Sequence, residues 1–503
     1  MFDLFMQGFS EVMTLSTILL ILLGTAVGLV FGSIPGLTAT MAIAIVLPMT
    51  FGMSPMEGMA ILMGLYIGGI SGGLIPAILL KLPGTPSSIA TTFDGYPMAR
   101  KGEAGKAFGY AILFSFLGGL LSIIILMLLS PPLATIALKF GPYEYFAITI
   151  FALTMISSLA GNSLVKGLIA GLLGIALAMV GSAPIDAFPR FTFGYSALDA
   201  GFNILPVLIG LFAVAEIIKA SERKISKGKS VDYKMKGFGF SVKDFFKQGW
   251  NGLRSSFIGT GIGILPGIGG GTANIIAYVT AKNRSKNPEE FGKGTPDGVV
   301  ASESANNAAV GGALVPLIAL GIPGDTVTAL LLGGLVIHGL TPGPLLFQNN
   351  GDVVYGIFIA LIIANIAMIA FLYYGMRFFT KILSIPKYIL LPIILVLCVV
   401  GAIGVNNRMF DAAALLFFGI LGYLLIKYKF PIAPIILGFI LGPLVETNLR
   451  RGLMYSQGDF IPFLTQPIAA VFLILAVLSI VFKLRDTHKK KKLDEAGGIN
   501  SGI

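Results

Sequence analysis

Cysteine and charge are both scarce in this chain. One cysteine, Cys398, among 503 residues excludes a disulfide within the chain and a metal site built from cysteines. Only 12% of the residues are charged, whereas soluble domains carry about 25%, so a soluble globular protein is excluded. The 35 basic residues exceed the 24 acidic ones, but they lie in short clusters between apolar segments, so the excess charge does not indicate a nucleic-acid partner and none is expected. Hydrophobic residues make up 55% of the chain, which also contains 65 glycines and 27 prolines. This composition is typical of a helical membrane protein.

The apolar segments predict an all-α polytopic membrane protein with about 11 spans plus two re-entrant hairpins, because a span needs about 20 apolar residues. Basic clusters in residues 219–254, after residue 482 and around Arg100 are expected in the cytoplasm. Segment 255–281 has such clusters at both ends and Pro266-Gly267 in its middle. It is therefore predicted to turn inside the membrane and return to the same side. No cleavable signal peptide is expected, since residues 1–10 contain Asp3 and no basic residue.

Two parts of the chain share an ordered set of proline-glycine motifs. Ile34-Pro35-Gly36 matches Leu265-Pro266-Gly267 at a separation of 231 residues, and the strings around Pro76 and Pro83 match those around Pro316 and Pro323 at 240. The first hairpin is expected to enter from outside and the second from the cytoplasm, which makes an inverted repeat, an arrangement common in secondary transporters. The predicted layout is a first repeat over 1–218 (hairpin 14–51, broken span 57–95, scaffold helices), a basic cytoplasmic linker over 219–254, a second repeat over 255–482 (hairpin 255–281, broken span 299–338, scaffold helices) and a basic cytoplasmic tail over 483–503.

The stretch from Gly298 to Pro344 is apolar but carries polar residues that are costly at membrane depth: Ser302, Glu303, Ser304, Asn306, Asn307, Asp325 and Thr326. A helix here would place Glu303 beside Asn307, and Gly321-Ile322-Pro323-Gly324 would break it. Irregular backbone survives at this depth only where it is buried in protein or lines a wet cavity. A binding site is therefore predicted, with an ordinary loop between two spans as the alternative.

Helix ends created by the breaks suit ions of both signs, because half-helix N-termini attract carboxylates and C-terminal carbonyls attract cations. No arginine lies in the polar stretch, so anion recognition falls to backbone N–H groups and hydroxyls. The substrate-binding candidates are Thr38, Thr40, Thr85, Ser87, Ser88, Thr272, Asn274 and Thr326. The coupling-cation candidates are Ser33, Asn306, Asn307, Gly321 and Asp325, and the structural turns are Pro35, Gly36, Pro83, Gly84, Pro266, Gly267, Pro323 and Gly324. Each hydroxyl could instead bond a carbonyl of its own helix.

The titratable residues of the apolar segments need separate interpretation. Glu303 and Asp325 could each bind a proton or hold hairpin backbone N–H groups in place. His338 could relay protons, although a lone histidine at a helix end is more often structural. Asp94 lies near Arg100 and could form an ion pair within a loop.

Four strings resemble the large membrane subunit of the tripartite tricarboxylate transporters, the TctA-type permeases: GSIPGLTATMAIAIVLP, KLPGTPSSIATTFDGYPMARKGEAGKA, GILPGIGGGTANIIAY and ASESANNAAVGGALVPLIALGIPGD. The resemblance covers roughly residues 15–480. It implies a multi-pass permease of the bacterial inner membrane that imports di- or tricarboxylates by Na⁺ or H⁺ symport. The implied partners are a small four-span membrane subunit and a periplasmic solute-binding protein, besides the carboxylate and membrane lipid. No cofactor, no catalytic residue and no metal apart from Na⁺ is expected.

Two other classes remain as alternatives. Broken helices also build selectivity filters, so an anion channel is the main one. Gly69-Ile70-Ser71-Gly72 fits a short pattern of intramembrane serine hydrolases, with His338 as the base of a Ser71–His338 pair. In a chain this rich in glycine, that pattern is weak.

Overall fold

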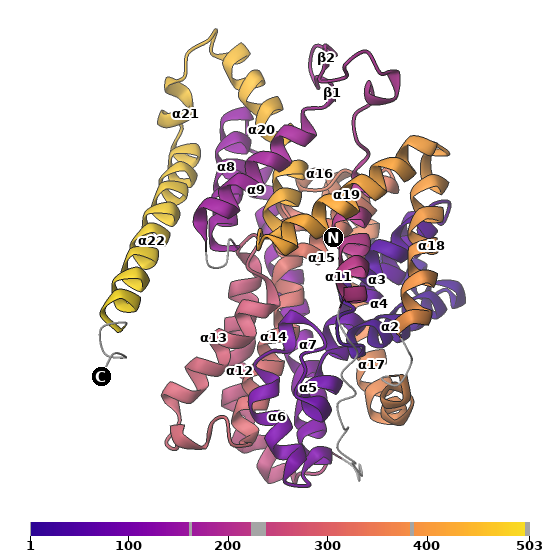
Figure 1. Ribbon diagram of the computed structural model, residues 1–503, viewed down its shortest axis with the longest axis vertical. Coiled ribbons are helices and arrows are strands. Elements are labelled where there is room, and N and C mark those ends of the chain that lie inside the picture. Colours follow the sequence, from indigo (N-terminus) through magenta and orange to yellow (C-terminus); the bar gives the residue numbers. More distant parts are fainter. Residues whose placement is uncertain (1, 160–162, 223–237, 383–386, 498–503) are drawn as a thin grey trace. The chain divides into compact units, whose positions relative to one another are not determined.

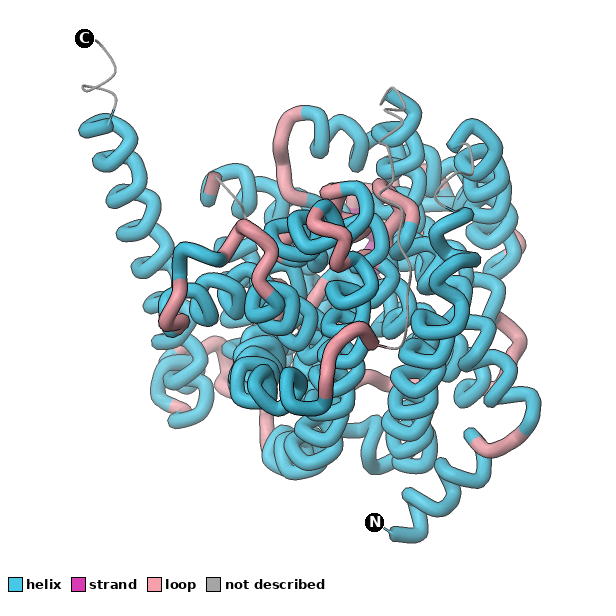
Figure 2. Tube along the Cα trace, turned by 90° about the horizontal axis from the view of Figure 1, so that it is seen from below, coloured by secondary structure: helices cyan, strands magenta, loops and turns pink. Residues whose placement is uncertain are grey.

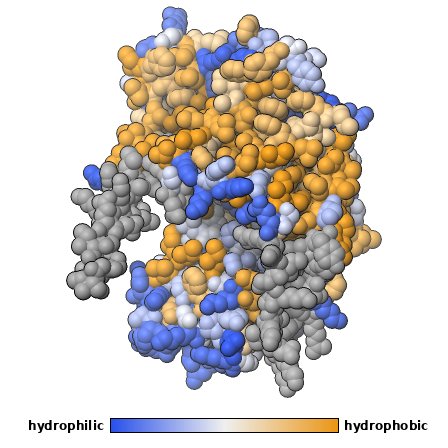
Figure 3. Space-filling view, viewed as in Figure 1, coloured by the Kyte–Doolittle hydropathy of each residue, from blue (hydrophilic) through white to orange (hydrophobic). Residues whose placement is uncertain are grey.

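The computed structural model describes residues 2–159, 163–222, 238–382 and 387–497, and most of them are helical (Figure 2). Among these residues, seven helices or helix pairs are long and apolar enough to cross a membrane: Leu15–Ser33, Pro55–Leu80, Ala104–Ala137, Ile204–Glu222, Gly351–Met376, Met409–Lys427 and Ile432–Tyr455. Large apolar side chains are exposed, for example Leu128 at 69% and Leu172 at 66%, and Figure 3 shows hydrophobic residues over much of the visible surface. An all-α polytopic membrane protein is confirmed, while the number of spans stays a prediction.

The chain divides into two compact units, Met1–Leu138 with Ile204–Tyr423, and Lys139–Asn203 with Leu424–Ile503. Unit 1 contains the following helices in chain order: α1 Phe2–Val12, α2 Leu15–Ser33, α3 Ala39–Val46, η1 Leu47–Thr50, α4 Pro55–Gly72, α5 Leu74–Leu80, η2 Pro86–Ser88, α6 Thr91–Arg100, α7 Ala104–Ala137, α10 Ile204–Ile209, η4 Gly210–Val214, α11 Ala215–Glu222, α12 Val242–Ile264, α13 Gly269–Arg284, η5 Pro288–Glu290, α14 Pro296–Leu320, α15 Thr326–Ile337, α16 Pro344–Asn349, α17 Gly351–Ile382, α18 Lys387–Asn406 and most of α19 Met409–Lys427. Unit 2 contains α8 Pro142–Leu159, α9 Leu164–Ala178, β1 Gly181–Ser182, β2 Pro189–Arg190, η3 Ser196–Leu198, α20 Ile432–Tyr455, α21 Ile461–Thr465 and α22 Pro467–Gly497.

Unit 2 is held together by close helix packing and by an ionic cluster. Gly438 of α20 faces α9, where an added Cβ would lie 2.1 Å from the carbonyl oxygen of Gly171. Arg450 pairs with both Asp186 and Glu446, at 3.0 and 3.1 Å. The hydrogen bond from Arg450 lowers the pKa of Asp186. The connection that carries the paired strands β1 and β2 is thereby tied to α20.

Unit 1 contains two helical hairpins, α2–α3 and α12–α13, whose turns fall at the predicted proline-glycine pairs. Gly36 and Gly267 have φ values of 94° and 82°, in the left-handed region that glycine adopts without strain. The helix α12 begins at Val242, well before the predicted start at 255, because Ser241 and Asp244 form a capping box there. Part of the predicted basic linker, residues 223–237, lies outside the described residues, as do residues 498–503 of the tail.

Each hairpin packs through glycines against a helix that follows it in the chain. The contacts occur at corresponding positions of the two copies. A Cβ on Gly28 of α2 would lie 2.6 Å from the carbonyl oxygen of Leu65 in α4, and one on Gly259 of α12 would lie 2.3 Å from that of Ala305 in α14. The two glycines are 231 residues apart and the two carbonyls 240, the separations of the sequence motifs. Small residues at such crossings let helix backbones approach closely.

The two helix breaks also have matching local structure. After α5 and α14 the chain enters the left-handed region at Lys81 and Gly321. The next residues donate backbone N–H groups to the carbonyls of Pro76 and Pro316, at 3.3 and 3.1 Å. A capping box follows at each break, Thr85 with Ser88 in the first copy and Asp325 with Thr328 in the second. The proline-glycine breaks are therefore built structures, each ending in a new helical turn.

Candidate functional site at the helix ends

The helix α14 carries most of the predicted polar residues and lies inside unit 1. Residues 298–319 are all buried, against α7, α12, α13 and α6 (Figure 1). The four residues Ser302, Glu303, Asn306 and Asn307 are each at most 1% exposed. These side chains face protein, so each must find a hydrogen-bond partner or hold a ligand.

Hairpin α12–α13 meets the break of the first copy, and we name this group the α13 cluster: Thr85, Ser87, Gly270, Asn274 and Asn306. The Asn274 amide donates to the carbonyl of Ser87 at 2.6 Å and accepts the backbone N–H of Ala90 at 3.3 Å. The hydroxyls of Thr85 and Ser87 are 3.4 Å apart. A Cβ on Gly270 would lie 3.1 Å from Oδ1 of Asn306 and 3.3 Å from Cβ of Ser87.

Hairpin α2–α3 meets the break of the second copy, and we name this group the α15 cluster: Thr40, Tyr66, Asp325, Thr326 and Thr328. The hydroxyls of Thr40 and Thr326 are 3.4 Å apart. The Asp325 carboxylate accepts the Tyr66 hydroxyl at 2.7 Å, and also the backbone N–H and hydroxyl of Thr328 at 2.7 and 2.8 Å. Its charge is therefore met by three donors and by the N-terminus of α15.

The four helix starts near these clusters differ in how their N–H groups are satisfied. Thr38 caps α3 by accepting the N–H of Met41, and Asp325 caps α15. The turn η2 is short and begins with the Thr85–Ser88 capping box. The 16-residue helix α13 has no side-chain cap and begins with three glycines. Its first N–H groups are thus the ones left for a ligand.

Asn306 lies beside this uncapped start of α13. Both polar atoms of its side chain are buried, and neither has a hydrogen-bond partner of ordinary geometry among the described residues, although the side chain lies close enough to interact with the carboxyl of Glu303. A buried amide without a partner costs roughly 1–3 kcal/mol, so a ligand that bonds to it recovers that free energy. An uncapped helix N-terminus with such an amide can bind an anion.

Glu303 lies one helical turn before Asn306 and anchors a network of uncharged partners. Its side-chain oxygens contact the hydroxyls of Thr91 in α6 and Ser115 in α7, at 2.5 and 3.0 Å. The Asn307 amide donates to the backbone carbonyl of Glu303 and accepts the Ser71 hydroxyl at 2.6 Å. The network links α4, α6, α7 and α14.

The predicted substrate residues divide between the two clusters, and the predicted cation residues do not form one group. Ser88 donates to the carbonyl of Thr85, and Thr272 is exposed. Ser33 donates to the carbonyl of Val30 in its own helix. Gly321 lies against Pro342 and Gly343. Asn306 belongs to the α13 cluster, whereas Asp325 belongs to the α15 cluster.

The predicted turn residues lie where the hairpins meet the breaks. The backbone N–H of Gly267 donates to the carbonyl of Gly324 at 2.6 Å. A Cβ on Gly84 would lie 2.3 Å from the carbonyl oxygen of Gly32, beside the first hairpin tip. Each tip is thus packed against a break.

Sequence reasoning missed Tyr66, and it gave Asp94 the wrong partner. The Asp94 carboxylate is buried and accepts the N–H groups of Gly292, Gly294 and Thr295, rather than pairing with Arg100. Tyr66 lies 240 residues before Asn306, so the repeat pairs these two positions. That register was the one signal that could have identified Tyr66.

The Ser71–His338 pair of the hydrolase alternative is not formed. The Ser71 hydroxyl donates to Asn307, while His338 contacts the Thr50 hydroxyl at 3.0 Å and packs against Gly58. Gly58 and Ser71 lie in the same helix, 13 residues apart, which is about 20 Å along the axis at 1.5 Å per residue. His338 therefore cannot act as a base for Ser71.

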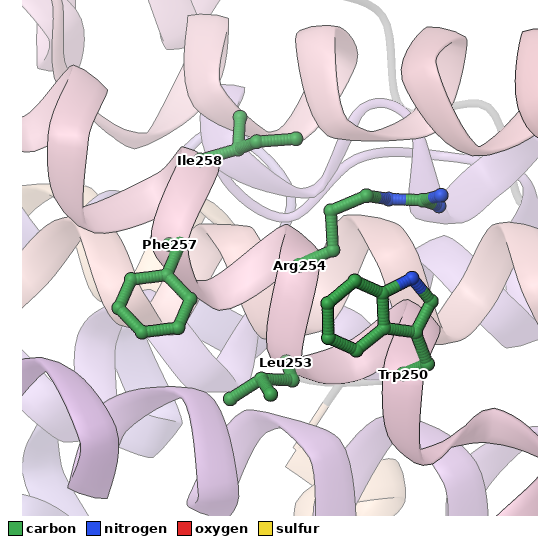
Figure 4. Close-up of a pocket in the computed structure, with 5 residues that line it drawn as sticks. All are labelled: Trp250, Leu253, Arg254, Phe257 and Ile258. Atoms are coloured by element: carbon green, nitrogen blue, oxygen red, sulfur yellow. The ribbon is translucent and has the colours of Figure 1, made fainter.

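A shallow groove of about 350 Å³ lies away from the polar clusters, on α12. Trp250, Leu253, Arg254, Phe257 and Ile258 line it, all from this one helix (Figure 4). Its lining is mainly apolar and its aromatic rings are exposed, Trp250 at 70% and Phe257 at 54%. Such a surface suits contact with lipid chains and gives no reason to place an anion there.

Helical hairpins and broken helices whose ends surround buried polar groups, in a multi-pass membrane protein, define a membrane transport protein. The chain belongs to the tripartite tricarboxylate transporter TctA family, whose model matches residues 18–437. It is 38% identical over 485 residues to an Agrobacterium vitis protein described as an uncharacterized 52.8 kDa protein in the TAR-I ttuC′ 3′ region, covering 96% of each chain. A second Agrobacterium vitis protein, described as uncharacterized and in the TAR-II ttuC′ 3′ region, is 39% identical over 234 residues, covering 46% of this chain and 97% of the relative. No solved structure matches the chain.

Proposed function

We propose that this protein is the large subunit of a tripartite importer that carries a di- or tricarboxylate across the bacterial inner membrane by Na⁺ or H⁺ symport. Its family belongs to tripartite transport systems. The proposed partners are a small four-span membrane subunit and a periplasmic solute-binding protein that delivers the substrate. Discrimination between carboxylates is assigned to the soluble partner, because backbone N–H groups and amides recognise a carboxylate without reading the rest of the molecule.

One observation carries the substrate site: the uncapped N-terminus of α13 beside the buried Asn306, whose side chain forms no hydrogen bond of ordinary geometry. The other two long helix starts near the clusters, α3 and α15, have side-chain caps. A substrate carboxylate at α13 would accept the free N–H groups and the Asn306 amide N–H. The hydroxyls of Thr85 and Ser87 lie in the same cluster and would add donors to a second carboxylate group.

An inverted repeat with two re-entrant hairpins is the architecture proposed for this site. Matching glycine contacts, left-handed helix ends and capping boxes at separations of 231 and 240 residues support it. Inverted repeats place broken helices near the bilayer midplane, where each half can alternate its exposure to the two sides. Movement of the hairpin-bearing helices against the remaining helices is the proposed access route.

The test is uptake by proteoliposomes that contain this protein with its candidate membrane partner, supplied with the binding protein and labelled di- and tricarboxylates. Separate Na⁺ and pH gradients identify the driving ion. Saturable, gradient-dependent uptake supports the proposal, whereas an ohmic anion current without saturation would support the channel.

The Asn306→Ala variant tests the site itself. Hydrogen bonds to charged groups contribute about 1.5–3 kcal/mol, and since 1.4 kcal/mol is tenfold, the apparent affinity for carboxylate should fall about tenfold or more. The matched control is Asn448→Ala, a partly buried asparagine of unit 2 whose amide forms a solvent-exposed hydrogen bond to the carbonyl of Leu444. If Asn306→Ala kept wild-type affinity, the site would be wrong even with transport established.

A further inference from the structure

The side chains around Glu303 form an unbroken line of oxygen atoms that ends at a backbone carbonyl. Oε1 of Glu303 lies 2.5 Å from Oγ1 of Thr91, which lies 3.1 Å from Oγ of Ser302. Oγ of Ser302 in turn lies 3.1 Å from the carbonyl oxygen of Val299. Glu303, Thr91 and Ser302 are all 0% exposed. These three side chains are therefore screened from bulk solvent.

The number of protons available along this line indicates the protonation state of the Glu303 carboxyl. Three oxygen–oxygen contacts need three protons, and the hydroxyls of Thr91 and Ser302 supply two. With Glu303 ionised, Thr91 donates to Glu303 and Ser302 donates to Val299, which leaves the contact between Thr91 and Ser302 without a proton of its own. With a proton on Glu303, its hydroxyl donates to Thr91, Thr91 donates to Ser302, and Ser302 donates to Val299. The other carboxyl oxygen accepts the proton of Ser115 at 3.0 Å.

Several charged groups on the packed helices are bound elsewhere, and Arg100 of α6, Lys243 of α12, and Lys282 and Arg284 of α13 are exposed. On α6, Asp94 accepts Tyr278 of α13 and three backbone N–H groups. On α7, Lys106 pairs with Glu103, and on α12, Arg254 donates to Asn251. On α4, Tyr66 donates to Asp325, and at the start of α14 the carboxylate of Asp297 accepts the Thr295 hydroxyl. Within the described residues, no ion pair includes Glu303.

We propose that Glu303 is the site of the coupling proton, bound in the conformation seen here and released toward the cytoplasm once the substrate has left. This inference rests on the proposed carboxylate site. Because Glu303 lies one turn from Asn306, an anion at the start of α13 favours the protonated form of Glu303. By linkage, the proton favours anion binding by the same factor. Each cycle then carries one proton inward with the substrate, and Glu303 returns as the carboxylate to take up another from outside.

The test uses Glu303→Gln in the reconstituted complex, with Glu103→Gln as the matched control because Glu103 is a half-exposed glutamate whose partner is Lys106. Glutamine presents an N–H donor and a carbonyl acceptor, so it imitates the protonated acid. Counterflow exchange of labelled carboxylate should persist at a rate within about threefold of the wild-type rate. Accumulation driven by a pH gradient should be lost. Glu303→Gln vesicles that accumulated substrate down a pH gradient like the wild type would overturn the proposal.

Infrared difference spectroscopy gives a readout that needs no transport. The purified full chain should show the carbonyl stretch of a protonated carboxylic acid, and this band should be missing from Glu303→Gln but present in Glu103→Gln. If the wild type transported no carboxylate, the proposed function would fall while the band would still report on Glu303. If transport followed only Na⁺ and the band were absent, the function would stand and the proton site would be wrong.

Discussion

The buried side chain of Asp94 joins α6 to α13 and to the connection that precedes α14. Its Oδ1 accepts three backbone N–H groups of residues 292–295 at 2.7 to 3.0 Å, and its Oδ2 accepts the Tyr278 hydroxyl at 2.8 Å. Figure 3 shows hydrophilic residues at the lower end of the view, where α6 and the connection after α13 lie. Asp94 thereby fixes the entry to α14, the helix that carries Glu303 and Asn306.

Replacement of Asp94 by alanine should lower stability more than most single changes. It leaves four donors without an acceptor, and each unsatisfied buried group costs about 1–3 kcal/mol. Tyr278→Phe, which removes one of the four bonds, should cost about 1 kcal/mol. Thermal unfolding in detergent measures both, with Asp459→Ala as the control, since Asp459 is exposed and accepts one N–H. A melting temperature for Asp94→Ala equal to that of the control would contradict this role.

The sequence indicated that Asp94 was charged and near Arg100, but not which groups it bonds. Its partners are N–H groups of a connection more than 190 residues away, and their direction depends on glycines with positive φ at 292 and 294. By contrast, the polar face of α14 followed from helical spacing alone. Residues on one regular element could be placed in advance, whereas pairs between an element and an irregular connection could not.

At the scale of elements, close approach of α12 and α14 depends on which face of α12 a glycine occupies. A Cβ on Gly259 would lie 2.3 Å from the carbonyl oxygen of Ala305, whereas Gly261, two residues later, has open space around its Cβ position. Gly36 and Gly267 were predictable as turns because proline-glycine pairs mark them. The start of α12 was not, since the hydrophobic pattern begins only after the helix has left its polar end.

The pair Gly259→Ala and Gly261→Ala tests this packing with one chemical change. Alanine stabilises an open helix position by about 0.5–1 kcal/mol relative to glycine. At Gly259 the added methyl forces the helices apart, which costs about 1–3 kcal/mol. Gly259→Ala should therefore lower the melting temperature in detergent while Gly261→Ala leaves it equal or higher. Equal effects at the two positions would mean that α12 and α14 do not pack as described.

At the scale of the molecule, the proposed topology places both ends of the α12–α13 hairpin on one side of the membrane. Lys247 and Lys286 are exposed near those ends, and Gln348 in α16 is exposed beyond α14 and α15. The only cysteine, Cys398, is buried, so a Cys398→Ala background is suitable for labelling.

Single cysteines at Lys247 and Lys286 should react with an impermeant maleimide from the cytoplasmic side only, because a re-entrant hairpin returns to its side of entry. A cysteine at Gln348 should react from the periplasmic side only. The measurement compares intact cells with inverted vesicles. Labelling of the Lys247 and Lys286 positions from opposite sides would show that the hairpin crosses the membrane.

The two capping boxes differ in charge at their first residue, and that difference distinguishes the two copies. Asp325 at the second break brings a carboxylate of its own to Tyr66. The corresponding residue at the first break is Thr85, and the residue corresponding to Tyr66 is Asn306. The α15 cluster therefore contains its own carboxylate, whereas the α13 cluster contains none. Under the proposed function the carboxylate of the substrate takes that place in the α13 cluster, so the Asp325 side chain shows how the protein can bind the acid that it transports.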